Sequence, residues 1–322
     1  MKIILFIFLT LSLNADDILT QYRLSGISVI EKQLDLKLTS EEYWNKELEN
    51  KDTSFGYLES YNSILICDKN SSNLSLYKLD TNNTFTQLKT YDAFTGKIPG
   101  DKKFEGDLKT PLGIYKIEQR LDKESKLDPF YGPLAFVTSY PNIYDRSRGK
   151  RGSGIWVHGF PINQTRDDFT RGCIAIDNES IKCLDNNIDI NNTILIINKD
   201  TRKVNVPKKR LNKILTELYK WRYAWKYSDI YNYLSFYAKD FKKTDGTHFD
   251  NFKIAKEFVF NKKDKKIILF NNINILKYPN TQNIYQISFH EIYKTKYISF
   301  IGNKTLMVKV DEEDHMKIFL EN

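Results

Sequence analysis

The sequence predicts an α+β protein in which helices and strands occupy separate blocks of the chain. Three patterns lead to this class. Apolar residues recur at helical spacing over residues 16–54, short runs alternate apolar and polar residues over 55–200, and an amphipathic helix precedes further strand-like runs over 210–322. A chain of 322 residues is long for one core, and 41% apolar residues suffice for more than one. We therefore expect two folded domains preceded by a helical arm.

Residues 1–15 have the composition of a secretory signal peptide. Lys2 precedes an apolar run from Ile3 to Leu13, and the small residue Ala15 lies just before two acids. The run is too short to span a bilayer. A membrane anchor or a buried helix is the alternative, which the short run and the lack of a Cys for lipid attachment disfavour. No other stretch is apolar enough to cross a membrane, so we expect a periplasmic protein with no stable membrane insertion.

Residues 16–54 are predicted to form a helical arm. Thr39–Glu42 combines a Thr-Ser pair with two acids, which is typical of a capped helix start. The apolar residues before it lie at helical spacing: Ile18, Leu19, Tyr22, Leu24, Ile27, Ile30 and Leu34. Such faces either pack on the body of the protein or pair with a second copy, so the arm is the candidate element for a homodimer.

Residues 55–200 are predicted to form a mainly β domain with a few helices. Short runs of alternating character are separated by clusters of Asn, Ser and Asp, as in hairpins and meanders. A capped helix start is expected near Asn178. The predicted strands are 63–67, 74–79, 84–88, 113–117, 135–137, 154–157 and 193–197.

Residues 210–322 are predicted to form a second, α+β domain after a polar linker at 201–209. An amphipathic helix runs from Leu211 to about Trp225, and another helix is expected from Ser228 to Tyr237. Helices followed by an antiparallel sheet predict a cone-shaped domain. The strands expected beyond the helices are 258–260, 266–270, 285–289, 296–301 and 305–310.

The residues that most strongly indicate chemistry are His158 and the run Thr170–Cys173. A thiol attacks as the thiolate, so Cys173 needs a neighbouring base or a positive field. His158, at the end of a predicted strand, is the candidate base, and the loop after it can return the chain to Cys173. Gly172 allows a tight turn that exposes amide groups to an oxyanion, and Arg171 adds positive charge. Each residue alone has an ordinary structural explanation, but their combination in an exported chain favours catalysis.

The three cysteines are Cys67, Cys173 and Cys183. An odd number in an oxidising compartment leaves at least one thiol unpaired within a chain. Cys67 and Cys183 are either buried thiols or partners in a disulfide, and the sequence leaves both open. No metal site is predicted, because metal-ligand spacing is missing among the remaining histidines, His248, His290 and His315.

The two motifs resemble the signature of the YkuD-type L,D-transpeptidases, which is His-Gly, a loop and then Ser/Thr-x-Gly-Cys. The stretch Gly106–Tyr115 is similar to the Thr-Pro-x-Gly motif at which a strand of that family begins, and the resemblance covers roughly residues 60–198. It implies a nucleophilic Cys173, a basic His158 and a Gly159 carbonyl that orients the imidazole ring. It also implies attack on the peptide bond between the L-centre of a diamino acid and D-Ala, with no metal or organic cofactor. The residues expected to bind the oxyanion and the substrate are Trp156, Thr170, Arg171 and Gly172.

The second domain resembles NTF2-like domains, which use a pocketed cone for small-molecule binding or dimerisation. The order of helical arm, YkuD-type domain and NTF2-like domain is similar to the cell-shape-determining L,D-carboxypeptidases of helical Gram-negative bacteria. That resemblance implies removal of the terminal D-Ala from tetrapeptide stems of peptidoglycan to give tripeptides, with an effect on cell shape. The residues that carry the NTF2 likeness, ahead of the antiparallel sheet, are Trp221, Trp225, Asp229 and Tyr233.

Two other functions remain open from the sequence. An L,D-transpeptidase would use an amine of a second stem in place of water, but Ala175 stands where many family members carry Arg or Asn, which weakens the case for holding an acceptor stem. A non-catalytic wall-binding or scaffold protein would use the pocket of the second domain instead. The formal net charge of +8, or +7 without the one Lys of residues 1–15, suits anionic wall polymers. Nucleic acid is not an expected partner, since the sequence carries no motif for binding it.

Overall fold

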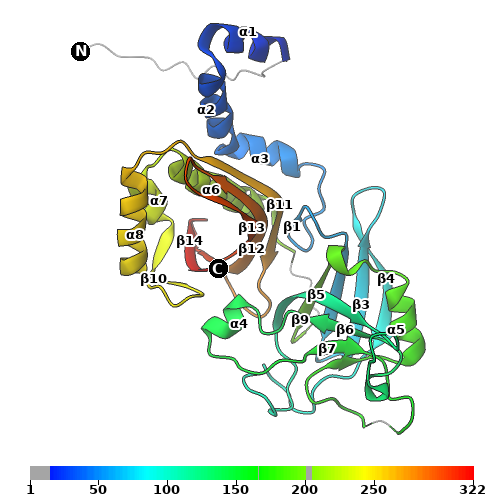
Figure 1. Cartoon of the computed structure of the whole chain (residues 1–322). Helices are drawn as coiled ribbons and strands as arrows, with labels where there is room; N and C mark the ends of the chain where they lie inside the picture. Colours follow the sequence, from blue (N-terminus) through cyan, green and yellow to red (C-terminus); the bar gives the residue numbers. More distant parts are fainter. Residues whose placement is uncertain (1–14, 166, 201–204) are drawn as a thin grey trace.

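The structure is a computed structural model that describes residues 15–165, 167–200 and 205–322. It contains a helical arm, an eight-stranded sheet and a six-stranded sheet with its own helices (Figure 1). This mixture is the α+β class that the sequence predicted. The predicted signal peptide lies outside the described residues except for Ala15, as do residues 201–204 of the predicted linker. Across the described ranges, no helix has the length and apolar character needed to cross a bilayer.

The arm consists of three helices, α1 (Ala15–Ser25), α2 (Ile27–Leu38) and α3 (Glu41–Leu48). Gly26 separates the first two with a φ of 74°, a left-handed conformation that glycine adopts without strain. Ser40 caps α3 by accepting a hydrogen bond from the Tyr43 amide at 3.3 Å, as the capping pattern predicted. The inner end of the arm packs on the second domain, because Trp44 and Leu48 belong to that domain's hydrophobic core.

The eight-stranded sheet carries the predicted catalytic motifs and has the order β4-β3-β2-β9-β5-β6-β7-β8. β2 is parallel to β9 and β7 is parallel to β8, whereas the other neighbours are antiparallel. Every strand predicted in this region is present, and the short strand β8 is an addition. The strands are β2 (Ser63–Asp68), β3 (Asn73–Leu79), β4 (Phe85–Asp92), β5 (Gly113–Leu121), β6 (Ala135–Thr138), β7 (Trp156–His158), β8 (Ile174–Ala175) and β9 (Thr193–Asn198).

Short helices connect these strands. α5 (Asn178–Asp185) begins where the sequence predicted, and the Asp177 carboxylate caps it by accepting hydrogen bonds from the amides of Glu179 and Ser180. Its buried residues Ile181 and Leu184 join the core of the eight-stranded sheet. The remaining helices are η1 (Pro129–Tyr131), α4 (Ile143–Ser147) and η2 (Ile190–Asn192).

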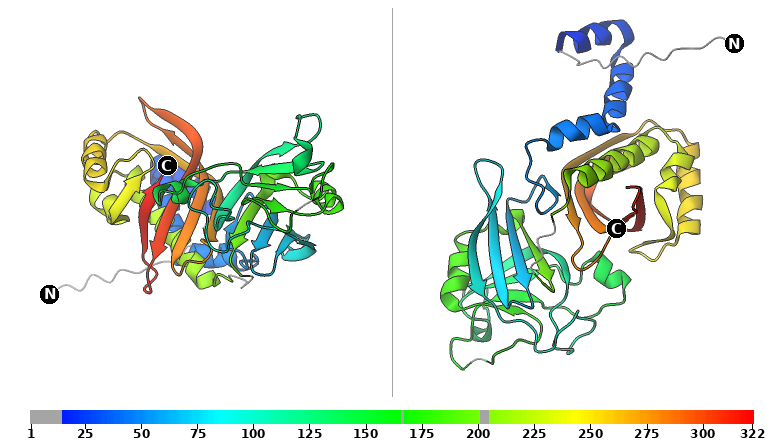
Figure 2. Two further views of the ribbon diagram at one scale, coloured as in Figure 1. Left: turned by 90° about the horizontal axis from the view of Figure 1, so that it is seen from below. Right: turned by 180° about the vertical axis from the view of Figure 1, so that it is seen from behind.

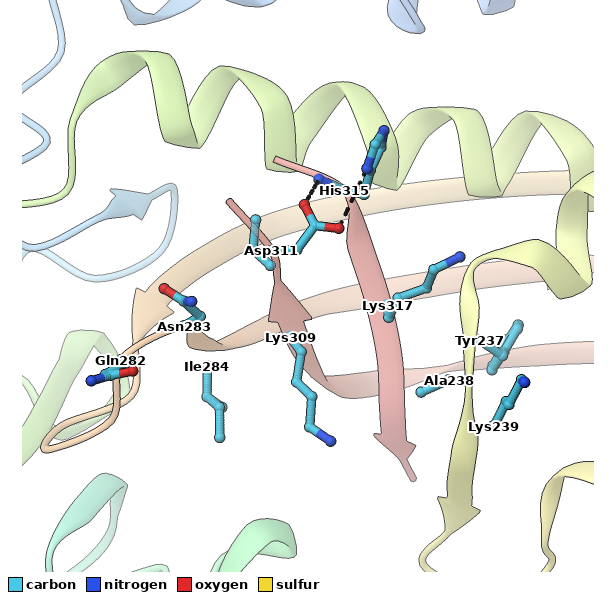
Figure 3. A pocket seen from close by; sticks show the side chains of 11 residues that line it. Tyr237, Ala238, Lys239, Gln282, Asn283, Ile284, Lys309, Asp311, His315 and Lys317 are labelled. Carbon is cyan, nitrogen blue, oxygen red and sulfur yellow. Dashed lines mark hydrogen bonds and ion pairs between the residues drawn. The ribbon is translucent and has the colours of Figure 1, made fainter. Parts of the chain in front are cut away.

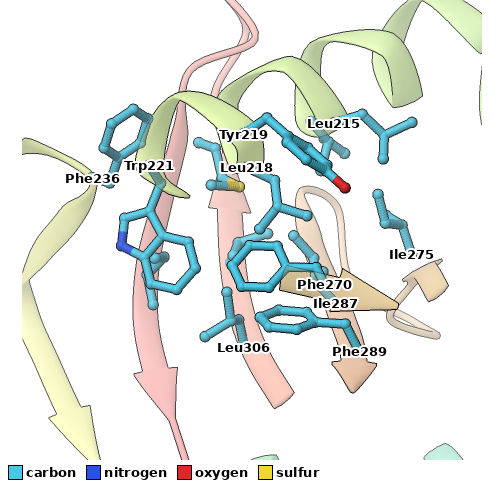
Figure 4. Close-up of a cluster of buried hydrophobic side chains, with 14 of the residues drawn as sticks. Leu215, Leu218, Tyr219, Trp221, Phe236, Phe270, Ile275, Ile287, Phe289 and Leu306 are labelled. Carbon is cyan, nitrogen blue, oxygen red and sulfur yellow. The ribbon is translucent and has the colours of Figure 1, made fainter. Parts of the chain in front are cut away.

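The second domain is a six-stranded sheet of order β1-β11-β12-β13-β14-β10, with helices packed on one face. Its core centres on Trp221 of α6, which stacks on Phe270 with ring centroids 5.8 Å apart (Figure 4). The helices are α6 (Lys208–Lys226), α7 (Ile230–Ser235) and α8 (Phe249–Asn261). The strands are β1 (Tyr57–Leu58), β10 (Tyr237–Lys243), β11 (Ile267–Lys277), β12 (Ile284–Lys294), β13 (Ser299–Val310) and β14 (Met316–Glu321).

The structure corrects three of the predicted elements in this domain. Residues 258–260 lie in α8 and not in a strand, because Phe252 and Phe260 form one buried face at helical spacing. The strands predicted at 296–301 and 305–310 are one strand, β13, whose pairing with β12 is continuous from Ser299 to Lys309. The helix predicted to end at Tyr237 ends at Ser235, and Tyr237 begins β10.

The two domains lie side by side (Figure 2). They share a hydrophobic core, so the position of one fixes the position of the other. One face of the eight-stranded sheet contributes Ile64, Ile114, Ile194 and Ile196, and the outer face of the six-stranded sheet contributes Leu276, Tyr278, Met307 and Leu320. β1 reinforces this contact, because Tyr57 pairs with Ile275 of β11 although it lies just before the first strand of the other sheet. The predicted catalytic residues lie at the β7–β8 edge of the eight-stranded sheet, with His158 as the last residue of β7 and Cys173 just before β8.

Candidate active site

The pairing of β7 with β8 brings the two predicted catalytic motifs together. The two strands are parallel, and His158 lies opposite Ala175. Cys173 directly precedes β8, so it lies beside the start of β7 at Trp156. Because side chains alternate between the faces of a strand, Trp156, His158 and Cys173 belong to one face of the sheet. The chain therefore leaves the sheet after His158 and returns to it just before Cys173.

The His158 ring is buried and held in one tautomer. Its Nδ1 lies 2.6 Å from the carbonyl oxygen of Gly159. A carbonyl only accepts hydrogen bonds, so Nδ1 carries the proton and the neutral ring has its lone pair on Nε2. Gly159 must be a glycine at this point, since a Cβ there would lie 2.5 Å from Asn178 Oδ1 and 2.9 Å from Pro133 Cδ. The backbone thus places the lone pair of the neutral His158 ring on Nε2, the atom that a general base would use.

The Cys173 thiol, the predicted nucleophile, is held in an environment that favours its protonated form. Its Sγ donates to the Gly154 carbonyl oxygen at 3.3 Å. Burial raises the pKa of the Cys173 thiol to about 11, although a hydrogen bond from the Trp156 backbone and the positive charge of Lys102 act in the opposite direction. The thiol form therefore predominates at neutral pH, and attack requires proton transfer to a base.

The Thr170 side chain holds the loop before Cys173 through two hydrogen bonds. Its Oγ1 accepts from the Gly172 amide at 3.0 Å and donates to the Cys173 carbonyl at 2.7 Å. The Gly172 N–H, which we expected to face an oxyanion, is therefore already engaged. Within the described part of the chain, the Cys173 N–H donates to no main-chain oxygen, so it is the better candidate for oxyanion binding. Arg171 is exposed at the rim, beside this loop.

Tyr131 belongs to the site and was not predicted from the sequence. Its ring centroid lies 4.7 Å from that of Trp156 and 5.1 Å from that of His158, with the His158 ring edge-on. Burial raises the pKa of the Tyr131 hydroxyl, and the nearby Cys173 adds to the rise. The local signal was present as an Asp-Pro start, since Asp128 caps η1 by accepting from the Phe130 amide. That signal predicts a turn but does not reveal that the turn packs against Trp156 and His158.

The other two cysteines take no part in this arrangement, and all three thiols are free. Cys67 is buried in β2, and burial raises the pKa of its thiol to about 12. Cys183 of α5 lies 3.1 Å from Lys89 Nζ, whose hydrogen bond lowers the pKa of that thiol. Among residues 15–165, 167–200 and 205–322, no group of three or more His, Cys, Asp or Glu side chains is arranged to hold a metal ion.

The second domain contains a different kind of polar site inside its cone. Trp221, Trp225 and Tyr233 form part of the buried aromatic core. The Lys256 ammonium lies 5.0 Å from the Trp225 ring centroid, and burial lowers the pKa of Lys256 to about 8. Asp229 has a local role, because its carboxylate caps α7 by accepting from the Asn232 amide. None of these residues lies in the loops around Cys173.

A basic concavity of about 750 Å³ lies on the outside of the second domain, where β10 separates from β14 (Figure 3). Lys309 at its rim is paired with Asp240 at 2.9 Å, and Lys317 donates to the Ser235 carbonyl. His315 lies 3.4 Å from the Asp311 carboxylate. These side chains contain no nucleophile with an adjacent base, so this concavity is not a second catalytic centre.

Comparison with known proteins agrees with this division of the chain. Residues 62–206 match the family described as the L,D-transpeptidase catalytic domain, YkuD, and residues 213–322 match the Cds6 C-terminal NTF2-like domain. The helical cell shape determining protein Pgp2 from Campylobacter jejuni is 36% identical, with a TM-score of 0.80 over 88% of this chain and 100% of that chain. Bd1075 of Bdellovibrio bacteriovorus is 25% identical, with a TM-score of 0.65 over 84% of this chain and 96% of that chain.

The match to a curated Escherichia coli relative covers a shorter segment of the chain. YafK, which carries the provisional description of an L,D-transpeptidase, is 33% identical over 82 residues. Those residues are 26% of this chain and 29% of YafK, so the match spans less than a third of that relative.

Proposed function

The chain belongs to the family that joins a YkuD L,D-transpeptidase catalytic domain to a Cds6-type C-terminal NTF2-like domain, and from that premise we propose that it is a cysteine-dependent peptidoglycan enzyme. Its specific reaction is L,D-carboxypeptidation, in which the terminal D-Ala is removed from a tetrapeptide stem to leave a tripeptide. The observation that carries this proposal is the fixed His158 tautomer on the strand beside Cys173. Removal of stem residues in the wall would link the protein to cell shape, the property named for Pgp2.

The chemistry is acyl transfer through a thioester. His158 Nε2 takes the proton from the Cys173 thiol, and the sulfur attacks the carbonyl carbon that precedes D-Ala. The Cys173 N–H stabilises the oxyanion of the tetrahedral intermediate. When the intermediate collapses, the C–N bond breaks and the imidazolium returns its proton to the departing D-Ala amine. A water molecule, deprotonated by His158, then attacks the thioester, and the tripeptide carboxylate and the thiol are released.

Two features of the site support hydrolysis with a short stem. Ala175 is buried opposite His158 and has no polar side chain. Its amide and carbonyl groups are both hydrogen-bonded to the main chain of Phe94, so Ala175 offers no polar group to an acceptor stem. Arg171 is exposed beside the nucleophile, where its guanidinium can bind the terminal carboxylate of the D-Ala that is removed. A substrate in peptidoglycan places the enzyme outside the cytoplasm, in agreement with the expected periplasmic location.

The exposed apolar surface of the arm supports a homodimer. Leu19, Tyr22 and Leu24 of α1 and Ile27 and Val29 of α2 are all exposed in the single chain. Apolar patches of this kind on a soluble chain mark contact surfaces. The double variant Leu24→Glu/Ile27→Glu should therefore sediment as a monomer where the wild type is a dimer, and equal masses for the two proteins would contradict this contact.

Mass spectrometry of purified muropeptides tests the reaction. The mature protein is incubated with tetrapeptide muropeptides in parallel with Cys173→Ala and with Cys183→Ser, a matched control for loss of a thiol away from the site. We expect tripeptides with the wild type and Cys183→Ser, and none with Cys173→Ala. Cross-linked dimers would instead assign transpeptidation. Unchanged substrate with all three proteins would reject the enzymatic function and favour a wall-binding role.

A further inference from the structure

A buried ion pair lies beneath the loop that carries the nucleophile. Lys102 Nζ and Asp107 Oδ1 are 2.8 Å apart, and each side chain is only 4% exposed. Taking a lysine ammonium out of water is costly unless a partner and further hydrogen bonds compensate for the lost hydration. A pair at this depth, next to a catalytic loop, is therefore a candidate for a functional role.

Asp107 is fixed by main-chain groups and stays ionised. Its carboxylate accepts from the amides of Lys103 at 2.7 Å, Phe104 at 3.2 Å and Lys109 at 3.1 Å. Burial alone would raise the pKa of Asp107, but the hydrogen bonds from Lys102 and these amides lower it to about 2. The carboxylate thus holds the Lys102 ammonium in one position across the physiological pH range.

Lys102 reaches the loop at Gly172, the residue before the nucleophile. A Cβ placed on Gly172 would lie 3.6 Å from Lys102 Nζ and 2.8 Å from the Lys109 carbonyl oxygen. Gly172 has a φ of 137°, so a residue without a side chain is what allows the loop to rest directly on this pair. The ammonium therefore lies against the residue that directly precedes Cys173.

Among the described residues, the titratable or charged groups near Cys173 come from several elements. His158 comes from β7, Tyr131 from η1, Arg171 from the same loop and Lys102 from the loop before β5. Arg171 is exposed, so water and salt screen its charge. Lys102 is buried, so its field reaches the sulfur through protein and is screened less.

We propose that Lys102 is an electrostatic positioning residue for the Cys173 nucleophile: its ammonium, anchored by Asp107 under Gly172, stabilises the thiolate that forms when His158 takes the proton. The catalytic role of Lys102 rests on the proposed function, but the experiment that tests its effect on the thiolate does not require that function. Lys102 transfers no proton and touches no substrate. Its positive charge stabilises the Cys173 thiolate before the attack on the substrate and again when the acyl group is released.

The rate at which iodoacetamide alkylates Cys173 tests the inference, because only the thiolate reacts. The mature full-length chain is studied in a Cys183→Ser background, and the rate is followed from pH 6 to pH 10 by mass spectrometry of the peptide that contains Cys173. The variant is Lys102→Met, which keeps the length of the side chain. The matched control is Lys150→Met, because Lys150 is also buried and paired, with Asp101 at 2.7 Å and Asp145 at 2.8 Å.

We expect Lys102→Met to alkylate about ten-fold more slowly at pH 7, which corresponds to a displacement of the whole rate profile by one pH unit toward higher pH. Lys150→Met should keep the wild-type profile. Equal profiles for wild type and Lys102→Met, or equal shifts in both variants, would overturn the inference. Because the assay needs no peptidoglycan, a failed carboxypeptidase assay leaves this result intact.

A second variant decides the question if Lys102→Met does not fold. Lys102→Gln keeps a polar partner for Asp107 but removes the charge, so it should slow alkylation at pH 7 by about ten-fold. Lys102→Arg keeps the charge beside Asp107, so it should alkylate within about two-fold of the wild-type rate, which general damage to the loop does not predict. A wild-type rate in Lys102→Gln, or a rate in Lys102→Arg as low as that in Lys102→Gln, would overturn the inference.

Discussion

The catalytic domain and the second domain both enclose charged side chains, but they hold them by different means. Around Cys173, main-chain groups hold the side chains in place: three amides donate hydrogen bonds to Asp107, and the Gly159 carbonyl orients His158. Inside the second domain, aromatic rings surround the charge, since Lys256 Nζ lies 5.0 Å from the Trp225 ring centroid and 5.4 Å from that of Tyr233.

This difference predicts how each region responds to substitution. Main-chain groups have fixed positions, so they hold a reacting atom precisely enough for catalysis but leave no room for a new side chain. Aromatic cores supply volume and tolerate small shifts, so they support the domain as a whole. Damage to the first region should therefore appear in activity, and damage to the second in stability.

Removal of the central aromatic ring of the second domain should have the largest effect. Trp221 is fully buried, stacks on Phe270 and donates to the Tyr237 hydroxyl at 3.3 Å. We expect Trp221→Ala to lower the free energy of unfolding by about 3–5 kcal/mol. The matched control is Trp156→Ala in the half-exposed catalytic site, which should lower activity with little change in stability. Urea unfolding measures the stability of the two variants. Equal unfolding midpoints would contradict the expected difference between the two domains.

A methyl group at Gly172 should have the next largest effect, and it should fall on activity. The new Cβ would lie 2.8 Å from the Lys109 carbonyl oxygen, so the loop must move and displace Cys173. A displacement of this size costs about 100-fold in rate. Gly149→Ala is the control, because Gly149 also has a positive φ of 73° but no atom within 4 Å of the new Cβ. Tripeptide formation should fall in the first variant only, and similar losses in both would show that backbone strain alone is responsible.

The junction of the arm and the second domain should respond more weakly and depend on pH. Asp35 of α2 accepts from Arg222 at 2.9 Å, Lys226 at 2.5 Å and Tyr227 at 2.8 Å. Burial alone would raise the pKa of Asp35, but these donors lower it below 3.8. We expect Asp35→Asn to lose about 2 kcal/mol at pH 7, since Arg222 loses the carboxylate with which it pairs and Lys226 keeps only its pair with Glu31, at 2.7 Å.

The sign of the pH dependence follows from the lowered pKa. The Asp35 contribution is complete above the unfolded pKa near 3.8 and disappears as the pH falls through the lower folded value. The difference in melting temperature between wild type and Asp35→Asn should therefore be constant from pH 7 to pH 5 and shrink below about pH 4. A difference that grows on acidification would contradict this assignment.

The sequence revealed the strands of the catalytic domain because their alternation and turn residues are local signals. The sequence-based prediction failed where the buried residues of a strand do not alternate with exposed ones. Tyr237 and Phe241 are the buried residues of β10 and lie four apart, so the start of this strand resembles the end of a helix. β14 ends in the buried Glu321, a residue that sequence patterns assign to the surface.

The same limit applies to the candidate site. His158, Gly159 and the run Thr170–Cys173 form motifs with recognisable spacing, so the sequence alone suffices to predict them as site residues. Lys102 and Tyr131 lie in separate loops, and only the fold brings them to the nucleophile. Nothing in their neighbours distinguishes them from surface residues, because the chemistry depends on contacts between segments far apart in the chain.

The smallest predicted effect separates the ring of Tyr131 from its hydroxyl. The ring packs edge-on against His158 at 5.1 Å, whereas the hydroxyl makes no hydrogen bond with any described residue. Tyr131→Phe should therefore keep the rate of tripeptide formation within about two-fold. Tyr131→Ala removes the surface that positions the imidazole and should lower kcat about ten-fold with a smaller change in KM. If Tyr131→Phe is as slow as Tyr131→Ala, the hydroxyl takes part in the reaction, and this site then relies on a side-chain group in addition to its main-chain supports.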